Sequence, residues 1–118
     1  MRGSVRGYQT LLEIGNPYKA NPGVELDNWL HEHFFAETSQ EPLPYSSNER
    51  ASEKLRARIR SLYGYKVYTG TTSVRTGKFF ARLETGASTS TETLAETLPL
   101  AIARLALVVA LRRDPELQ

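Results

Sequence analysis

The sequence predicts one α+β domain in which a small antiparallel sheet packs against helices. Three segments, residues 24–35, 46–63 and 97–113, repeat apolar residues every three or four positions, which is the spacing of a helix with a buried face. Residues 65–71 and 78–84 alternate apolar and polar side chains, as the strands of a hairpin do. The 118 residues, of which 40% are hydrophobic, suit one domain with one core.

The domain is expected to cover residues 24–113. Residues 1–23 show no clean period and contain turn signals at positions 16–17 and 21–23, so we assign them to an N-terminal extension. Residues 114–118 begin with an Asp-Pro pair, which stops the last helix, and we assign them to a short C-terminal tail.

The first two helices carry local start and stop signals. Glu25 and Asp27 lie in the first turn of the first helix, where carboxylates favour the positive end of the helix dipole. Ser46 and Glu49 have the spacing of a reciprocal capping box, which predicts the start of the second helix. Gly64 stands where a left-handed residue is expected to end that helix.

The remaining chain combines an ambiguous segment with a strongly apolar helix. Residues 86–93 are rich in small hydroxylated side chains and form either a loop or a short third strand. Thr97 is expected to cap the last helix. That helix is apolar nearly all round, so it is either the central element of the core or part of an interface between copies of the chain. It contains Arg104 and is shorter than the ~20 apolar residues of a membrane span, so we expect no membrane contact and a cytoplasmic protein.

Composition and spacing exclude several kinds of chemistry. The absence of cysteine excludes disulfides, thiolate zinc sites, iron–sulfur clusters and a thiol nucleophile. His31 and His33 flank Glu32, but residues i and i+2 of a helix point ~200° apart and cannot share one metal ion. We expect His33 at the edge of the core and His31 in solvent. The sequence has no nucleophile elbow and no phosphate loop, and we assign no catalytic, cofactor-binding or metal-binding residue.

A cluster of cations is the most informative polar feature. The formal net charge is only +2, but most of the 15 basic residues are arginines. Arg56 and Arg60 share one face of the second helix, beside a row formed by Arg50, Lys54 and Arg58. Arginines with tyrosines suit a protein interface or a single nucleic-acid strand, whereas the simpler interpretation is a solvated helix face. We call the candidate partner-binding residues the basic surface: Arg50, Lys54, Arg56, Arg58, Arg60, Tyr65, Tyr68, Arg75, Lys78 and Arg82.

Five short motifs follow one another in a recognisable order. They are LDNWL at residues 26–30, LPYSS at 43–47, GYKVY at 64–68, GKFFARL at 77–83 and ETLPLAIARLAL at 96–107. Their order and spacing resemble the phage ABA-sandwich family of small phage and prophage proteins. Members of that family typically open a helix with Pro-Tyr-Ser-Thr and close with a motif near Thr-x-Pro-Leu-Ala-Ile.

The resemblance covers roughly residues 24–111, so the stretch before Val24 has no counterpart in the family pattern, and two positions depart from that pattern. Ser47 stands at the usual threonine, and Leu105 stands near a usual alanine. The resemblance implies an α/β/α sandwich, with the small antiparallel sheet between helical layers. It implies no chemistry, because the family has no established activity.

These observations lead to one main functional hypothesis and two others. The main hypothesis is a small phage-type accessory protein of the bacterial host cytoplasm, which acts by binding another macromolecule. A protein is the expected partner, such as a host or defence factor. The alternative is nucleic-acid binding through the basic face of the second helix. An enzyme with an unrecognised site is the most distant alternative.

Overall fold

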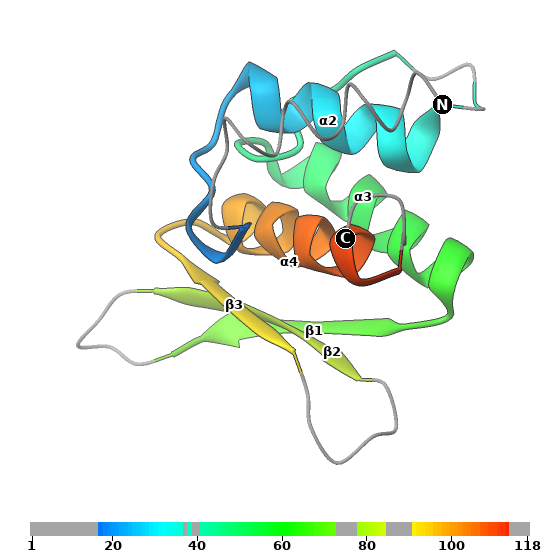
Figure 1. The fold of residues 1–118 in the computed structure, drawn as a ribbon. Helices are drawn as coiled ribbons and strands as arrows, with labels where there is room; N and C mark the ends of the chain where they lie inside the picture. The colour runs from blue at the N-terminus through cyan, green and yellow to red at the C-terminus, as the bar shows by residue number, and fades with distance from the viewer. Residues whose placement is uncertain (1–16, 37, 39–40, 73–77, 85–90, 114–118) are drawn as a thin grey trace.

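In the described part of the chain, three α-helices lie on one side of a three-stranded antiparallel sheet of order β1-β2-β3 (Figure 1). This arrangement confirms the α+β class. The computed structural model describes residues 17–36, 38, 41–72, 78–84 and 91–113. Its elements, in chain order, are η1 (Pro17–Lys19), α2 (Val24–Phe35), α3 (Glu49–Tyr63), β1 (Lys66–Thr71), β2 (Phe79–Glu84), β3 (Glu92–Ala95) and α4 (Leu98–Arg113).

Helix α4 occupies the middle of the domain, between the sheet and the pair formed by α2 and α3 (Figure 1). Residues 99–103 and 105–110 of this helix are all buried within the single chain. The apolar surface of α4 is therefore covered by its own domain, which is the first of the two alternatives that the sequence left open. The sheet consequently carries described helices on one face only, whereas the resemblance implies helices on both.

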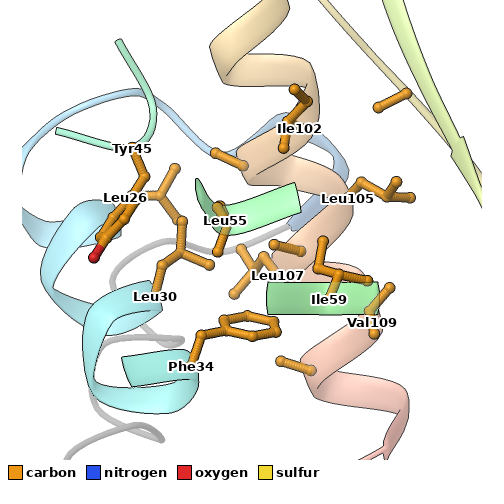
Figure 2. Close-up of a cluster of buried hydrophobic side chains, with 14 of the residues drawn as sticks. Leu26, Leu30, Phe34, Tyr45, Leu55, Ile59, Ile102, Leu105, Leu107 and Val109 are labelled. Carbon is orange, nitrogen blue, oxygen red and sulfur yellow. The ribbon is translucent and has the colours of Figure 1, made fainter. Parts of the chain in front are cut away.

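The apolar core is built where α2, α3 and α4 meet. Figure 2 shows Leu26, Leu30 and Phe34 of α2 lying close to Leu55 of α3 and Leu107 of α4, together with Tyr45 from the connection before α3. Leu105 lies on the opposite side of α4 (Figure 2). The fully buried members are Leu26, Leu30, Phe34, Tyr45, Leu55, Ile59, Ile102, Leu105, Leu107 and Val109. Burial of this much apolar surface is the main favourable contribution to folding.

The sheet is a hairpin extended by a short third strand. Strand β1 pairs with β2 from Lys66↔Glu84 to Thr71↔Phe79, and β2 pairs with β3 from Phe79↔Ala95 to Arg82↔Glu92. Of the two alternatives for the segment after the hairpin, a strand forms, but at residues 92–95 rather than within 86–93. The buried hydroxyl of Thr93 donates to the carbonyl of Ala101, 2.7 Å away on α4, so the sheet is bonded to the central helix as well as packed on it.

The cap of α3 differs from the predicted one. Asn48 is the N-cap, because its side-chain oxygen accepts from the amide of Ala51 at 2.9 Å. The predicted capping box of Ser46 and Glu49 is wrong, since Ser46 is buried and bonded elsewhere. The end of the helix is confirmed: Gly64 has φ 74° and its amide donates to the carbonyl of Arg60 at 2.8 Å.

Two other local predictions for the helices are confirmed, whereas the predicted Asp-Pro stop and the C-terminal tail at 114–118 lie outside the described residues. Helix α2 has the predicted bounds, Val24–Phe35. Thr97 caps α4, because its hydroxyl accepts from the amide of Leu100 at 3.3 Å.

In the part of the chain that the structure describes, no helix is long and apolar enough to cross a membrane.

The last residues of the predicted N-terminal extension belong to the same core. Ala20, just after η1, is completely buried, and its carbonyl accepts from Nε of Arg104 at 2.8 Å. The φ of Gly23 is 148°, a conformation that glycine adopts without strain, and its carbonyl accepts from the amide of Asp27. The folded unit therefore extends to residue 17 at least.

Ser46 and Asp27 join the start of α2 to the loop before α3. The amide of Ser46 donates to Oδ1 of Asp27 at 2.8 Å, and the Ser46 hydroxyl accepts from the amide of Gly23 at 3.1 Å. Both residues are buried. Burial raises the pKa of Asp27 above its ordinary value of 3.8, against the opposing effect of the Ser46 hydrogen bonds.

The raised pKa of Asp27 predicts how one substitution changes the pH dependence of stability. The stability that the protonated side chain contributes is fully present below pH 3.8 and is lost as pH rises through the folded pKa. Asp27→Asn keeps an acceptor for the Ser46 amide without carrying a charge. We therefore expect the variant to gain stability relative to the wild type as pH rises from about 4 to about 7, measured by urea unfolding. A wild type that gains on the variant over this range would contradict the assignment.

Candidate interaction surface

One face of the sheet is open to solvent in the described structure. Strand residues alternate between the two faces, and Val67, Ala81 and Thr93 point toward α4 and are buried. The opposite side chains are only partly covered: Tyr68 is 47% exposed and Leu94 is 40% exposed. We define the open face as the described outward side chains of the three strands, which are Lys66, Tyr68, Phe80, Arg82, Glu92 and Leu94.

An ion pair and a cation–π contact order the centre of the open face. Nη2 and Nε of Arg82 donate to Oε1 of Glu92 at 2.7 and 3.0 Å, directly across the strand register. The Arg82 guanidinium also lies 5.0 Å from the centroid of the Phe80 ring. The charges of Arg82 and Glu92 balance, so the middle of the open face is locally neutral.

Gly70 makes room for the Phe80 ring. The two residues are cross-strand partners, and a Cβ at Gly70 would lie 2.8 Å from Cε2 of Phe80. The ring therefore packs against the bare backbone of the neighbouring strand, an arrangement that only glycine at this position permits without movement of the ring.

A groove runs between α3 and the edge strand β1. It has a volume of about 330 Å³ and is lined by Glu53, Arg56, Ala57, Arg60, Lys66, Val67 and Tyr68. Nη2 of Arg56 donates to the carbonyl of Val67 at 2.5 Å, and Nη1 of Arg56 lies 3.5 Å from Oε2 of Glu53. Tyr68 belongs both to the groove and to the open face, so the two features are continuous.

The structure brings together only part of the predicted basic surface. Arg56, Arg60 and Tyr68 meet in the groove, and Arg82 lies across the sheet from Tyr68. Arg50 and Lys54 are exposed on α3 but do not line the groove. Tyr65 is half-buried and stacks on Tyr63, and Lys78 is exposed just before β2. Arg75 lies outside the described residues.

Arg58 has a structural role that the helical spacing did not reveal. Its Nε donates to the carbonyl of Phe34 at 2.6 Å, and its guanidinium lies 5.8 Å from the centroid of the Phe35 ring. Arg58 thus binds the C-terminal end of α2 to α3, where a cation also favours the negative end of the helix dipole.

An arginine side chain donates a hydrogen bond to an outward backbone carbonyl on each edge strand of the sheet. Arg56 takes the Val67 carbonyl of β1, as described above, and Nη1 of Arg104 takes the Leu94 carbonyl of β3 at 2.7 Å. Exposed sheet edges invite pairing with another chain, so side chains that occupy edge carbonyls protect the sheet. Sequence reasoning placed Arg104 only as a polar interruption of an apolar helix.

The two histidines are held by tyrosines. Nδ1 of His31 lies 3.0 Å from the hydroxyl of Tyr45, and Nε2 of His33 lies 2.9 Å from the hydroxyl of Tyr63, both in hydrogen bonds. His33 is half-buried, as expected at a core edge, but the expectation that His31 lies in solvent is wrong. His31 is half-buried because it also stacks near Phe35. The described residues contain no group of three or more candidate metal ligands.

Several residues of this surface were missed at the level of sequence. Lys66 and Glu53 line the groove, and Phe80, Glu92 and Leu94 belong to the open face. The alternation of β1 and β2 already separated Lys66 and Phe80 from the buried side chains. Glu92 and Leu94 carried no usable signal, because the third strand was ambiguous.

Comparisons with known proteins add no relative to this picture. No protein-family model, no curated protein and no solved structure matches this chain. The resemblance to the phage ABA-sandwich family therefore rests on the sequence motifs alone.

The different roles of Arg58 and Lys54 predict a measurable contrast. Arg58→Met removes a charge-assisted hydrogen bond to a backbone carbonyl and a cation–π contact, so we expect the free energy of unfolding to fall by about 1–2 kcal/mol. Lys54→Met, at an exposed site of the same helix, should stay within about 0.5 kcal/mol of the wild type. Urea unfolding of both variants makes the comparison, and equal stabilities would refute the structural role of Arg58.

Proposed function

We propose that this chain is a protein-binding module of the phage accessory type, which docks a partner protein on the open face of its sheet. The main support for this proposal is the composition of the open face. An antiparallel sheet with one solvated face normally presents polar side chains there. This sheet presents Lys66 and the neutral Arg82–Glu92 pair. Beside them it also presents the exposed Tyr68 and Leu94 and the half-buried Phe80. Contiguous exposed apolar side chains, with tyrosine and arginine among them, are typical of interaction surfaces.

The chemistry of the open face indicates what the partner surface carries. Three apolar side chains call for an apolar patch on the partner, which would be buried against them. The Arg82–Glu92 pair lies among them and offers both a donor and acceptor oxygens, so polar groups at the rim of the partner patch can be satisfied.

A protein partner suits the surface better than a nucleic acid. Three arginines of the basic surface, Arg56, Arg58 and Arg82, are already bonded to groups of this chain. The carboxylates of Glu53 and Glu92 pair with Arg56 and Arg82 and oppose the approach of a phosphate backbone. Nucleic-acid affinity depends on many unopposed phosphate contacts, which this arrangement does not favour.

The resemblance to the phage ABA-sandwich family supports an accessory role in the cytoplasm of a bacterial host. Within that role, a host or defence factor is the expected kind of partner, since docking on such a factor requires a surface but no chemistry. The proposal includes no catalytic step, cofactor or metal.

A pair of double variants tests the proposal. Tyr68→Ser with Leu94→Ser removes the exposed apolar side chains of the open face, whereas Val24→Ser with Leu62→Ser removes two exposed apolar side chains from α2 and α3. Each immobilised protein is exposed to host lysate, and captured proteins are quantified by mass spectrometry and then titrated as purified proteins. We expect a partner whose Kd is unchanged with the control pair and raised about tenfold or more with the open-face pair, since central interface residues dominate binding energy.

Three results would argue against the proposal. The first is a partner that is lost equally with both double variants. The second is a wild-type dimer in light scattering that the open-face pair abolishes, because the occupant would then be a second copy of the chain. The third is single-stranded DNA that binds the wild type tightly at low salt and dissociates steeply as salt rises, because phosphate contacts would then dominate.

A further inference from the structure

We infer that the groove between α3 and β1 binds an extended acidic segment, whose carboxylates pair with Arg60 and Lys66. The inference deepens the proposed function, because the segment would belong to the partner that docks on the adjoining open face. The groove and the open face share Tyr68, so one partner chain can contact both.

The dimensions of the groove suit a few side chains. Its volume of about 330 Å³ lies at the lower end of the range for small-ligand sites. Ala57 has a short side chain on α3 and Val67 is buried in β1, so the space between the two elements is left open rather than filled. An extended segment that lays one or two side chains between helix and strand fits this space.

The charges of the groove favour carboxylates. Three cations, Arg56, Arg60 and Lys66, line it against the single carboxylate of Glu53. Glu53 is 3.5 Å from Arg56, so the positive excess falls on Arg60 and Lys66. Both are exposed, and neither forms an ion pair with another residue that the structure describes. An exposed arginine and an exposed lysine that form no such ion pair are suited to an incoming carboxylate.

The position of Arg56 determines how the segment is held. Its side chain already occupies the Val67 carbonyl on the outer edge of β1 and is oriented by Glu53. Continuous addition of a new strand along β1 would require that carbonyl as an acceptor. The segment is therefore held through its side chains at the mouth of the groove, and Arg56 keeps the floor of the groove in place.

The groove favours a peptide over a nucleic-acid strand. A protein that binds a single strand follows the backbone with a continuous basic track and stacked aromatic rings. Here three cations line one short groove, and Glu53 lies inside it. An isolated carboxylate can approach Arg60 and Lys66 from the open side, whereas a row of phosphates would also pass Glu53.

Fluorescence anisotropy with two labelled peptides tests the groove directly. One peptide alternates glutamate and valine, and its matched control alternates glutamine and valine. Arg60→Gln with Lys66→Gln removes the two cations of the groove, and Arg50→Gln with Lys54→Gln removes the same charges from α3 outside it. All four positions are exposed, and thermal unfolding confirms that both double variants remain folded.

We expect the glutamate peptide to bind the wild type and the Arg50/Lys54 variant alike, and to bind the Arg60/Lys66 variant about tenfold more weakly or worse. Glu53→Gln, which removes the opposing charge, should tighten binding by about twofold to threefold. Four results overturn the inference: no binding of the glutamate peptide, equal binding of the glutamine peptide, equal losses in both double variants, or tighter binding of a single-stranded oligonucleotide at the same salt concentration.

One further variant separates this inference from the proposed function. Leu94→Ser changes the open face but lies outside the groove. If the proposed function fails, partner capture is insensitive to Leu94→Ser while the glutamate peptide still requires Arg60 and Lys66. If the groove inference fails, the glutamate peptide shows no such requirement, whatever happens to partner capture.

Discussion

The structure depends on the complete enclosure of helix α4. An almost uniformly apolar helix is stable in water only when other elements cover it on every side. Helices α2 and α3 cover one side, the sheet covers the other, and the chain just after η1 contributes Ala20, which is fully buried. Arg104 is half-exposed among the buried residues of α4, and both of its hydrogen bonds go to backbone carbonyls of covering segments. Arg104, the polar residue within α4, thus bonds the helix to the segments that cover it.

Features determined by neighbouring residues could be predicted from the sequence. The bounds of α2, the left-handed end of α3 at Gly64 and the Thr97 cap each depend on a few adjacent positions, and all three were correct. The capping box at Ser46 failed because a distant carboxylate, Asp27, takes the Ser46 amide. Local spacing cannot register such a competitor. For the same reason, the sequence did not show that α4 lies in the middle of the domain. A strongly apolar helix has the same residue pattern at the centre of a core and at an interface between copies of the chain.

The candidate surface was only partly predictable. Helical spacing correctly placed Arg56 and Arg60 on one face, and they meet in the groove. It assigned Arg58 to the same basic surface, because periodicity describes directions around a helix and not the carbonyls that a neighbouring helix presents. The open face required the pairing register, which sets Arg82 opposite Glu92 and Phe80 beside Leu94. The sequence carried the alternation of the strands but not their partners.

The occupied edge carbonyls bear on whether the protein aggregates at high concentration. Sheets with apolar faces are hazardous when their edges are free, because strands from successive molecules can extend the ladder into fibres. Here Arg56 closes an acceptor on β1 and Arg104 closes one on β3. The open face therefore remains available to a partner, whereas edge-to-edge pairing of strands from different molecules meets an arginine side chain at both edge strands.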